Sequence, residues 1–245
     1  MDEAEIPLLI ARLPMRERPK IPRARARLSE RLLLWISKGR RIDGLWVGTA
    51  ADESSPVLRP VEEAHGLIKR YDRIRYDRLV HDFDRVWVRV LPAARGSFNY
   101  LLNACQIDER HVLADATRPE LIALTIVHEA THARLMRCGI GYEEKLRARV
   151  EAVCARRELA FAAKLPDGQQ AHAEAALDLT YSPDIWSDAS RQAQIDEDAP
   201  AALRHLGVPE WLIRFIMVKA PYSRKAVRMA RRLRGMAGKV RRRRS

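Results

Sequence analysis

The sequence predicts an α+β fold that is mostly helical, with one small sheet packed against a central helix. Residues 85–90 alternate valine with Arg or Trp, which is the two-residue period of a strand with one buried face. Residues 117–136 combine helix-start signals with a run of apolar residues. Helical patterns then continue to residue 219, and others precede the strand, so we expect extra helices at both ends of this core.

Three helices are predicted before the strand. Residues 28–38 form a short one, expected to pack on the body of the protein. Pro60 begins a second helix that runs to about Tyr71, because proline is favoured in the first turn. Residues 76–84 form the third. The apolar face of the first helix consists of Leu28, Leu32, Trp35 and Ile36.

Two more strands are expected between the first strand and the central helix. Gly and Ser at 96–97 are expected to break the chain. Residues 100–107 and 111–113 are the strand candidates, with a turn at 108–109. His111 stands alone in the second candidate, so a structural role is expected for it.

The central helix has strong signals at both ends. Thr117, Pro119 and Glu120 form a capping box with proline inside the first turn. Gly139 and Gly141 predict where the helix stops. Later helices are predicted at 142–164, 169–179, 187–205 and 209–219.

The net charge of +13 is concentrated at the C-terminal end. Residues 211–245 contain 13 Lys and Arg and no Asp or Glu, so 32 basic residues remain to balance the 32 acidic ones. The chain therefore divides into a flexible Arg- and Pro-rich arm (1–27), a single domain (28–219) and a basic tail (220–245). The tail is either a solubilising segment or a contact for anionic lipid or nucleic acid.

Cysteine usage and the N-terminus indicate a cytoplasmic protein. The three cysteines are odd in number and form no C-x-x-C pair, which is typical of a reducing compartment. Cys138 and Cys154 have the chemistry of zinc ligands, although buried thiols are the commoner case. The N-terminal residues lack a signal-peptide pattern, and no apolar run reaches the ~18 residues of a membrane span. Peripheral membrane association through the tail is the alternative.

The central helix carries a His-Glu-x-x-His motif, residues 128–132. On a helix, His128 and His132 lie about 40° apart around the axis, so both imidazoles can bind one Zn²⁺. Glu129 lies on the flank of that face, where it is poorly placed as a ligand and well placed to contact a water on the metal. Zinc lowers the pKa of such a water to about 7, and a carboxylate can take its proton.

A structural interpretation is also open. A His-Glu-x-x-His motif also arises by chance in some sequences. In that case His128, His132 and Glu129 would be ordinary polar residues of a buried helix. The zinc interpretation requires a capped helix with apolar flanks, which the sequence has, and a third ligand.

The next helix carries three acidic residues, Glu144, Glu151 and Glu158, at seven-residue spacing. They share one face, because seven residues are close to two helical turns. A solvated acidic stripe is the simpler interpretation. The neighbours of Glu151 are apolar, however, so Glu151 is the member most expected to point inward.

Together, His128-Glu129-x-x-His132 and Glu151 on the following helix resemble the gluzincin branch of zinc metallopeptidases, in particular its small minimal members. The resemblance covers roughly residues 85–165. It implies a zincin-like core, Zn²⁺ held by His128, His132 and Glu151, and Glu129 as general base. It also implies an edge strand that pairs with an extended peptide substrate.

The sequence departs from the gluzincin pattern at two points. Larger members often carry an Asp four residues after the ligand Glu, where this chain has Ala155. No residue is clearly placed to stabilise an oxyanion, although Tyr181 and His172 are candidates by position. If the third ligand were not Glu151, the alternatives would be His111, Cys138 or Glu144.

Two classes of function follow from the sequence. The first is a zinc-dependent hydrolase, expected to be a peptidase, that acts on a peptide or protein with Glu129 and Tyr181 as catalytic residues. The second is a non-catalytic binding protein in which the basic tail contacts anionic lipid or nucleic acid. Zinc content would separate them.

Overall fold

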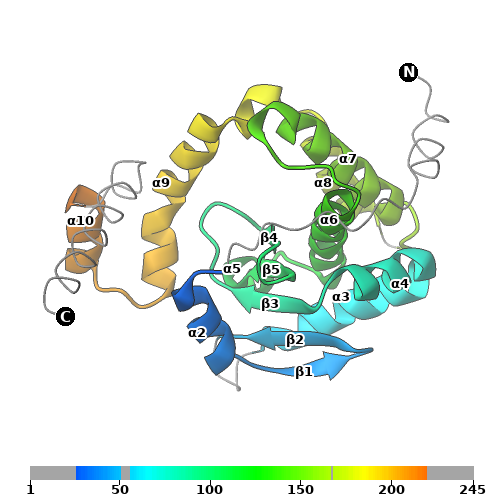
Figure 1. Cartoon of the computed structure of the whole chain (residues 1–245), viewed down its shortest axis with the longest axis horizontal. Helices are drawn as coiled ribbons and strands as arrows, with labels where there is room; N and C mark the ends of the chain where they lie inside the picture. The colour runs from blue at the N-terminus through cyan, green and yellow to red at the C-terminus, as the bar shows by residue number, and fades with distance from the viewer. Residues whose placement is uncertain (1–25, 51–55, 167, 220–245) are drawn as a thin grey trace, which may run out of the picture.

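The computed structural model describes residues 26–50, 56–166 and 168–219. The predicted basic tail (220–245) and nearly all of the predicted arm (1–27) lie outside the described residues. Within the described part, the fold is α+β, mostly helical, with a small mixed sheet (Figure 1).

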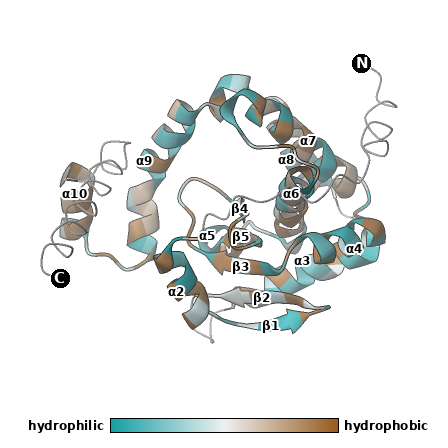
Figure 2. Cartoon of the chain, in the orientation of Figure 1, coloured by the Kyte–Doolittle hydropathy of each residue, from teal (hydrophilic) through white to brown (hydrophobic). Residues whose placement is uncertain are grey.

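Five strands form the sheet in the order β1-β2-β3-β5-β4. The central pairs β2–β3 and β3–β5 are parallel, whereas β1 and β4 run antiparallel at the two edges. β1 is exposed and charged, which protects that edge from pairing with other chains (Figure 2). The strands are β1 (Lys38–Ile42), β2 (Leu45–Thr49), β3 (Arg85–Arg89), β4 (Gly96–Asn99) and β5 (Ala104–Asp108).

Helices account for most of the remaining described residues. They are α2 (Leu28–Ile36), α3 (Leu58–Tyr71), α4 (Arg73–Asp82), α5 (Glu109–Leu113), α6 (Pro119–Arg137), α7 (Glu144–Ala162), α8 (Gln169–Asp178), the 3₁₀ turn η1 (Pro183–Trp186), α9 (Asp188–His205) and α10 (Glu210–Lys219). Among the described residues, no helix is long and apolar enough to cross a membrane.

The main core lies between one face of the sheet and helices α3 and α6. Val86 and Val88 of β3 point into it, together with Ile107 of β5 and Ile122 and Ile126 of α6. The strand predicted at 85–90 is thus confirmed as β3, but it is buried on both faces and not on one, since Trp87 is as fully buried as the two valines.

The opposite face of the sheet is covered near α2. Trp87 is fully buried there, and Leu33 and Leu34 of α2 pack against its cluster. The side chain of Ser37 accepts a hydrogen bond of 3.1 Å from the Trp87 indole. The face of α2 predicted to pack on the body is the wrong one, because Leu28, Leu32, Trp35 and Ile36 are exposed.

α9 leads away from α6 and α7 and is held at its start and again at Asp198 (Figure 1). At its start, Asp188 pairs with Arg147 of α7 at 2.9 Å. Farther along, Asp198 pairs with Arg110 of α5 at 2.7 Å and accepts a 2.7 Å hydrogen bond from the backbone amide of Ala93. The helix therefore bridges α7 and the β3–β4 loop.

Four further local expectations are wrong. The strand expected at 100–107 begins only at Ala104, and no turn lies at 108–109, because Asp108 ends β5 and Glu109 begins α5. Residues 111–113 lie in the short helix α5 rather than in a strand, because two apolar residues are too few to define a period. Residues 96–97 belong to strand β4 and do not break the chain. The capping box is absent: Arg118 is the N-cap of α6 and no side chain bonds to the first turn, although Pro119 lies there as predicted.

The β1–β2 hairpin was not expected from the sequence. Its turn is Asp43-Gly44, and both residues have positive φ (49° and 87°), as a type I′ turn requires. An Asp-Gly pair between two short strands is a known hairpin signal, so the turn could have been found from the sequence.

Candidate metal centre

α6 presents His128 and His132 on one face, one helical turn apart. Their ring centroids are 4.9 Å apart, and both side chains are partly buried. Most of the rest of α6 is apolar and buried, which fixes the helix against the sheet and sets the direction of this face. The two histidines therefore meet at the side of α6 that faces α7.

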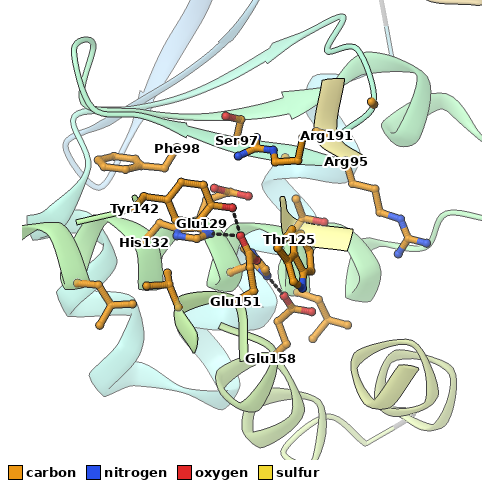
Figure 3. A pocket seen from close by; sticks show the side chains of 18 of the residues that line it. Arg95, Ser97, Phe98, Thr125, Glu129, His132, Tyr142, Glu151, Glu158 and Arg191 are labelled. Atoms are coloured by element: carbon orange, nitrogen blue, oxygen red, sulfur yellow. Dashed lines mark hydrogen bonds and ion pairs between the residues drawn. The ribbon is translucent and has the colours of Figure 1, made fainter. Parts of the chain in front are cut away.

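Glu151 of α7 lies between the two histidines (Figure 3). One carboxylate oxygen is 3.0 Å from Nε2 of His128, and the other is 3.6 Å from Nε2 of His132. Glu151 is buried, so the inward orientation expected from its apolar neighbours is found. The structure thus brings together the three side chains that the sequence singled out as ligands.

Glu158, two turns further along α7, bonds to the other nitrogen of His128. Its carboxylate contacts Nδ1, which leaves Nε2 directed at Glu151. A carboxylate on the far nitrogen of a ligating histidine is a common arrangement in metal sites. Glu158 therefore holds the His128 ring from the side opposite Glu151, a contact that Ala155 cannot make. The seven-residue acidic spacing was the sequence signal for it.

Tyr142, just before α7, was not singled out by the sequence. Its hydroxyl donates a hydrogen bond to Glu151, and its ring packs edge-on against His132 with centroids 5.0 Å apart. A single tyrosine in a loop after two glycines has no distinctive pattern. Only the packing of α7 against α6 brings it to the site.

Cys154 is a fully buried free thiol one turn beyond Glu151. Ligand atoms of Cys154, His128 and His132 all lie within 4.8 Å of one another, so these three residues also form a group able to hold a metal ion. Burial raises the pKa of the thiol. Two overlapping ligand sets therefore share the histidine pair.

Glu129 is buried beside the histidines but points to the edge strand. Burial raises the pKa of its carboxyl to about 7, against an opposing hydrogen bond from the backbone of Phe98 in β4. A carboxyl with a pKa near 7 takes up and releases protons at neutral pH, which is the property required of a general base.

The donors of this site fit a zinc ion. Burial and the nearby His128 lower the pKa of His132 to about 4, so its imidazole is neutral, the form that binds metals. Burial alone would raise the pKa of Glu151, but its hydrogen bond with His128 and the charges around it lower it and favour the carboxylate. Burial lowers the pKa of His128, but the negative groups around it, among them Glu151 and Glu158, raise it overall, so a metal that binds its Nε2 must displace a proton. Two imidazoles and one carboxylate are a known catalytic zinc ligand set.

These residues line a cleft of about 740 Å³. One wall is β4, an edge strand of the described sheet, whose residues Gly96, Ser97 and Phe98 line the cleft. The other side is formed by η1 and α9, which contribute Trp186 and Arg191. The cleft gives the buried cluster access to solvent.

The remaining sequence candidates differ in position. Tyr181 lines the cleft but is half exposed and makes no contact with the histidines in the described structure. His172 is exposed on α8 and is not among the cleft-lining residues. His111, Cys138 and Glu144 lie outside the cluster: His111 bonds Thr117, Cys138 is exposed, and Glu144 accepts a hydrogen bond from the amide of Asp188.

Comparisons of this chain with models of protein families, with curated proteins and with solved structures found no match.

Proposed function

We propose that this protein is a zinc-dependent hydrolase, most simply a peptidase with a zincin-like core. The observation that carries the proposal is the convergence of His128, His132 and Glu151, with the buried carboxyl of Glu129 beside them in an open cleft. Two imidazoles and a carboxylate leave the fourth position of a tetrahedral zinc ion free, as catalytic sites do.

In the proposed site, His128, His132 and Glu151 hold the metal and Glu158 orients His128. Bound zinc would supply Lewis-acid polarisation of the substrate carbonyl and a lowered pKa of water. Glu129 removes the proton from the attacking water and returns it to the leaving amine nitrogen.

The free edge of β4 supplies the binding surface for an extended peptide. Added-strand pairing uses the unpaired backbone groups of an edge strand and demands little of the substrate sequence. Ser97 and Phe98 line the cleft beside Glu129, so a paired peptide would run past the proposed metal ligands. Tyr142, rather than Tyr181, is the phenol adjacent to those ligands, and we assign it the role of orienting Glu151 through the hydrogen bond that its hydroxyl donates.

A closed metal site is the second candidate, because Cys154 lies within reach of both histidines. A site with ligands from His128, His132, Cys154 and Glu151 would have no free position and would be structural. Substitution with Co²⁺ distinguishes the two, since a thiolate ligand produces an intense charge-transfer absorption that a carboxylate does not.

The test is the zinc content of the purified protein and of single variants. The proposal requires about one zinc per chain in wild type, loss of zinc in His128→Ala and Glu151→Gln, and retention in Cys154→Ser. Glu129→Gln must retain zinc but lose peptide hydrolysis. Absence of zinc after reconstitution would refute the proposal. Thiolate absorption of the Co²⁺-substituted protein would establish the closed site instead.

A further inference from the structure

Arg191 places a positive charge in the cleft next to the proposed metal ligands. Its guanidinium stacks on the ring of Tyr142, 5.5 Å from the centroid, and Tyr142 in turn contacts both His132 and Glu151. Figure 3 shows the side chain of Arg191 reaching from α9 into the cleft beside Tyr142. Its charge also contributes to the low pKa of His132.

The other arginines near this point already have acidic partners. Arg95, which also lines the cleft, pairs with Glu174 at 2.7 Å. Arg147 stacks on the same tyrosine ring but pairs with Asp188 at 2.9 Å and donates to the carbonyl of Trp186. In the part of the chain that the structure describes, Arg191 makes no ion pair, so its charge is not neutralised by a neighbouring carboxylate.

Arg191 is also held in place. It lies near the start of α9, between the Asp188–Arg147 pair and the Asp198 contacts with Arg110 and Ala93. A guanidinium on a fastened helix loses less freedom on binding an anion than one on a mobile loop. The planar fork of its N–H donors matches a carboxylate, which it binds with two parallel hydrogen bonds.

We propose that Arg191 forms a subsite for a substrate carboxylate, so that the cleft prefers substrates with an acidic group close to the bond that is cleaved. This inference rests on the proposed function. The guanidinium is 5.5 Å from the centre of the Tyr142 ring, which is 5.0 Å from the centre of the His132 ring. An extended peptide covers this combined distance in about three residues or fewer. The carboxylate belongs to an Asp or Glu side chain or to the C-terminus of a short peptide.

The test uses small probes that carry a hydroxamate, which chelates zinc, at one end. The other end is a carboxylate or the matching carboxamide, separated by two, three or four methylene groups. Binding to the zinc-loaded protein is measured by calorimetry. For at least one spacer we expect the carboxylate probe to bind about 10-fold or more tightly than its amide, since hydrogen bonds to charged groups are worth that much.

Arg191→Gln must remove this preference while it retains zinc and binding of the amide probe. Arg204→Gln, on the same helix but exposed and paired with Glu210, is the matched control and must keep the preference. Equal binding of acid and amide at every spacer in wild type would overturn the subsite and leave the metal centre intact. Failure of all probes to bind, together with absence of zinc, would overturn the proposed function and the subsite with it.

The source of the carboxylate is determined with peptide hydroxamates that carry Asp or Asn and end in a free or an amidated C-terminus. A preference for Asp with amidated ends identifies an acidic side chain. A preference confined to free ends identifies the terminal carboxylate. Either pattern, if lost in Arg191→Gln, supports the subsite, and the absence of both contradicts it.

Discussion

Two glutamates at seven-residue spacing on α7 have different tasks. Glu151 faces both histidines through Nε2, whereas Glu158 contacts only Nδ1 of His128. The third member of the series, Glu144, is exposed and remote from the histidines. Identical side chains on one helical face thus divide into a proposed ligand, its proposed support and a surface residue, according to which part of His128, if any, each one meets.

We predict that Glu158→Gln weakens zinc binding by about 10- to 100-fold without unfolding the protein, because an outer partner of a ligating histidine is usually worth that factor. Competition with a zinc chelator gives the affinity. Glu144→Gln removes the same charge from the same helix and is expected to leave the affinity unchanged. Equal affinities for wild type and Glu158→Gln would show that the contact is incidental.

His65 is a buried histidine of α3 with no metal partner. Its ring packs edge-on against Tyr76, and burial lowers its pKa from 6.5 to about 4, with Asp43 and Lys69 as the charged groups nearby. Between these two pH values the unfolded chain binds a proton that the folded chain does not. Stability is therefore lost as the pH falls from about 6.5 to about 4, and the loss is of order 3 kcal/mol.

The check is thermal unfolding of wild type and His65→Gln between pH 7 and pH 4.5, with a chelator present so that metal binding does not contribute. The variant lacks the titrating group, so its free energy of unfolding must decline less steeply with falling pH. Parallel declines would refute the assignment.

At the scale of elements, the site depends on how closely β4 approaches α6. A Cβ atom at Gly96 would lie 2.5 Å from Cγ2 of Thr125 and 3.0 Å from a carboxylate oxygen of Glu129. Only glycine permits this approach, which places the backbone of Phe98 within hydrogen-bonding reach of Glu129.

Gly96→Ala is expected to destabilise the protein by about 1–3 kcal/mol, the usual cost of an added methyl group in a packed contact. Thr125→Ser removes the clashing methyl but keeps the hydroxyl that bonds to the carbonyl of Leu121, so the double variant should recover most of the loss. Chemical denaturation measures both. As control, Gly66→Ala on α3, where nothing lies within 4 Å, should be neutral or stabilising.

Over the whole molecule, the excess positive charge and the proposed metal ligands lie in different parts of the chain. The cleft and its ligands belong to the described residues, and the excess positive charge belongs to residues 211–245. In α10, which directly precedes the tail, Trp211, Phe215 and Val218 form an exposed apolar stripe. A basic segment beside an apolar helix face is typical of contact with anionic lipid.

We predict that deletion of residues 220–245 leaves zinc content unchanged and abolishes binding to vesicles rich in anionic lipid. The deleted segment carries 11 Lys and Arg and no acid, and each basic residue near such a surface contributes roughly 1 kcal/mol. Vesicle co-sedimentation at two salt concentrations measures the effect. Vesicle binding that survives the deletion, or binding of nucleic acid in its place, would contradict the lipid assignment.

Features that depend on a local pattern could be predicted from the amino-acid sequence alone. The alternation at 85–89 determined a strand, and apolar residues behind Pro119 determined the buried helix that carries His128 and His132. Period and propensity act over a few residues, so one chain segment contains the whole signal. The same reasoning located Glu151 on the inner face of its helix, since its sequence neighbours are apolar.

Which distant side chains share the site could be seen only from the packing of the helices. Tyr142 and Arg191 are unremarkable in sequence, and nothing in the sequence favours Cys154 over Cys138 as a ligand. All three reach the histidines because α7 packs on α6 and α9 bridges the cleft. The strand at Gly96 was not predicted for a related reason. Taken alone, a glycine indicates a break in a strand, but here glycine is required because α6 packs closely against β4. Such contacts join residues that are far apart in the chain, and no local pattern encodes them.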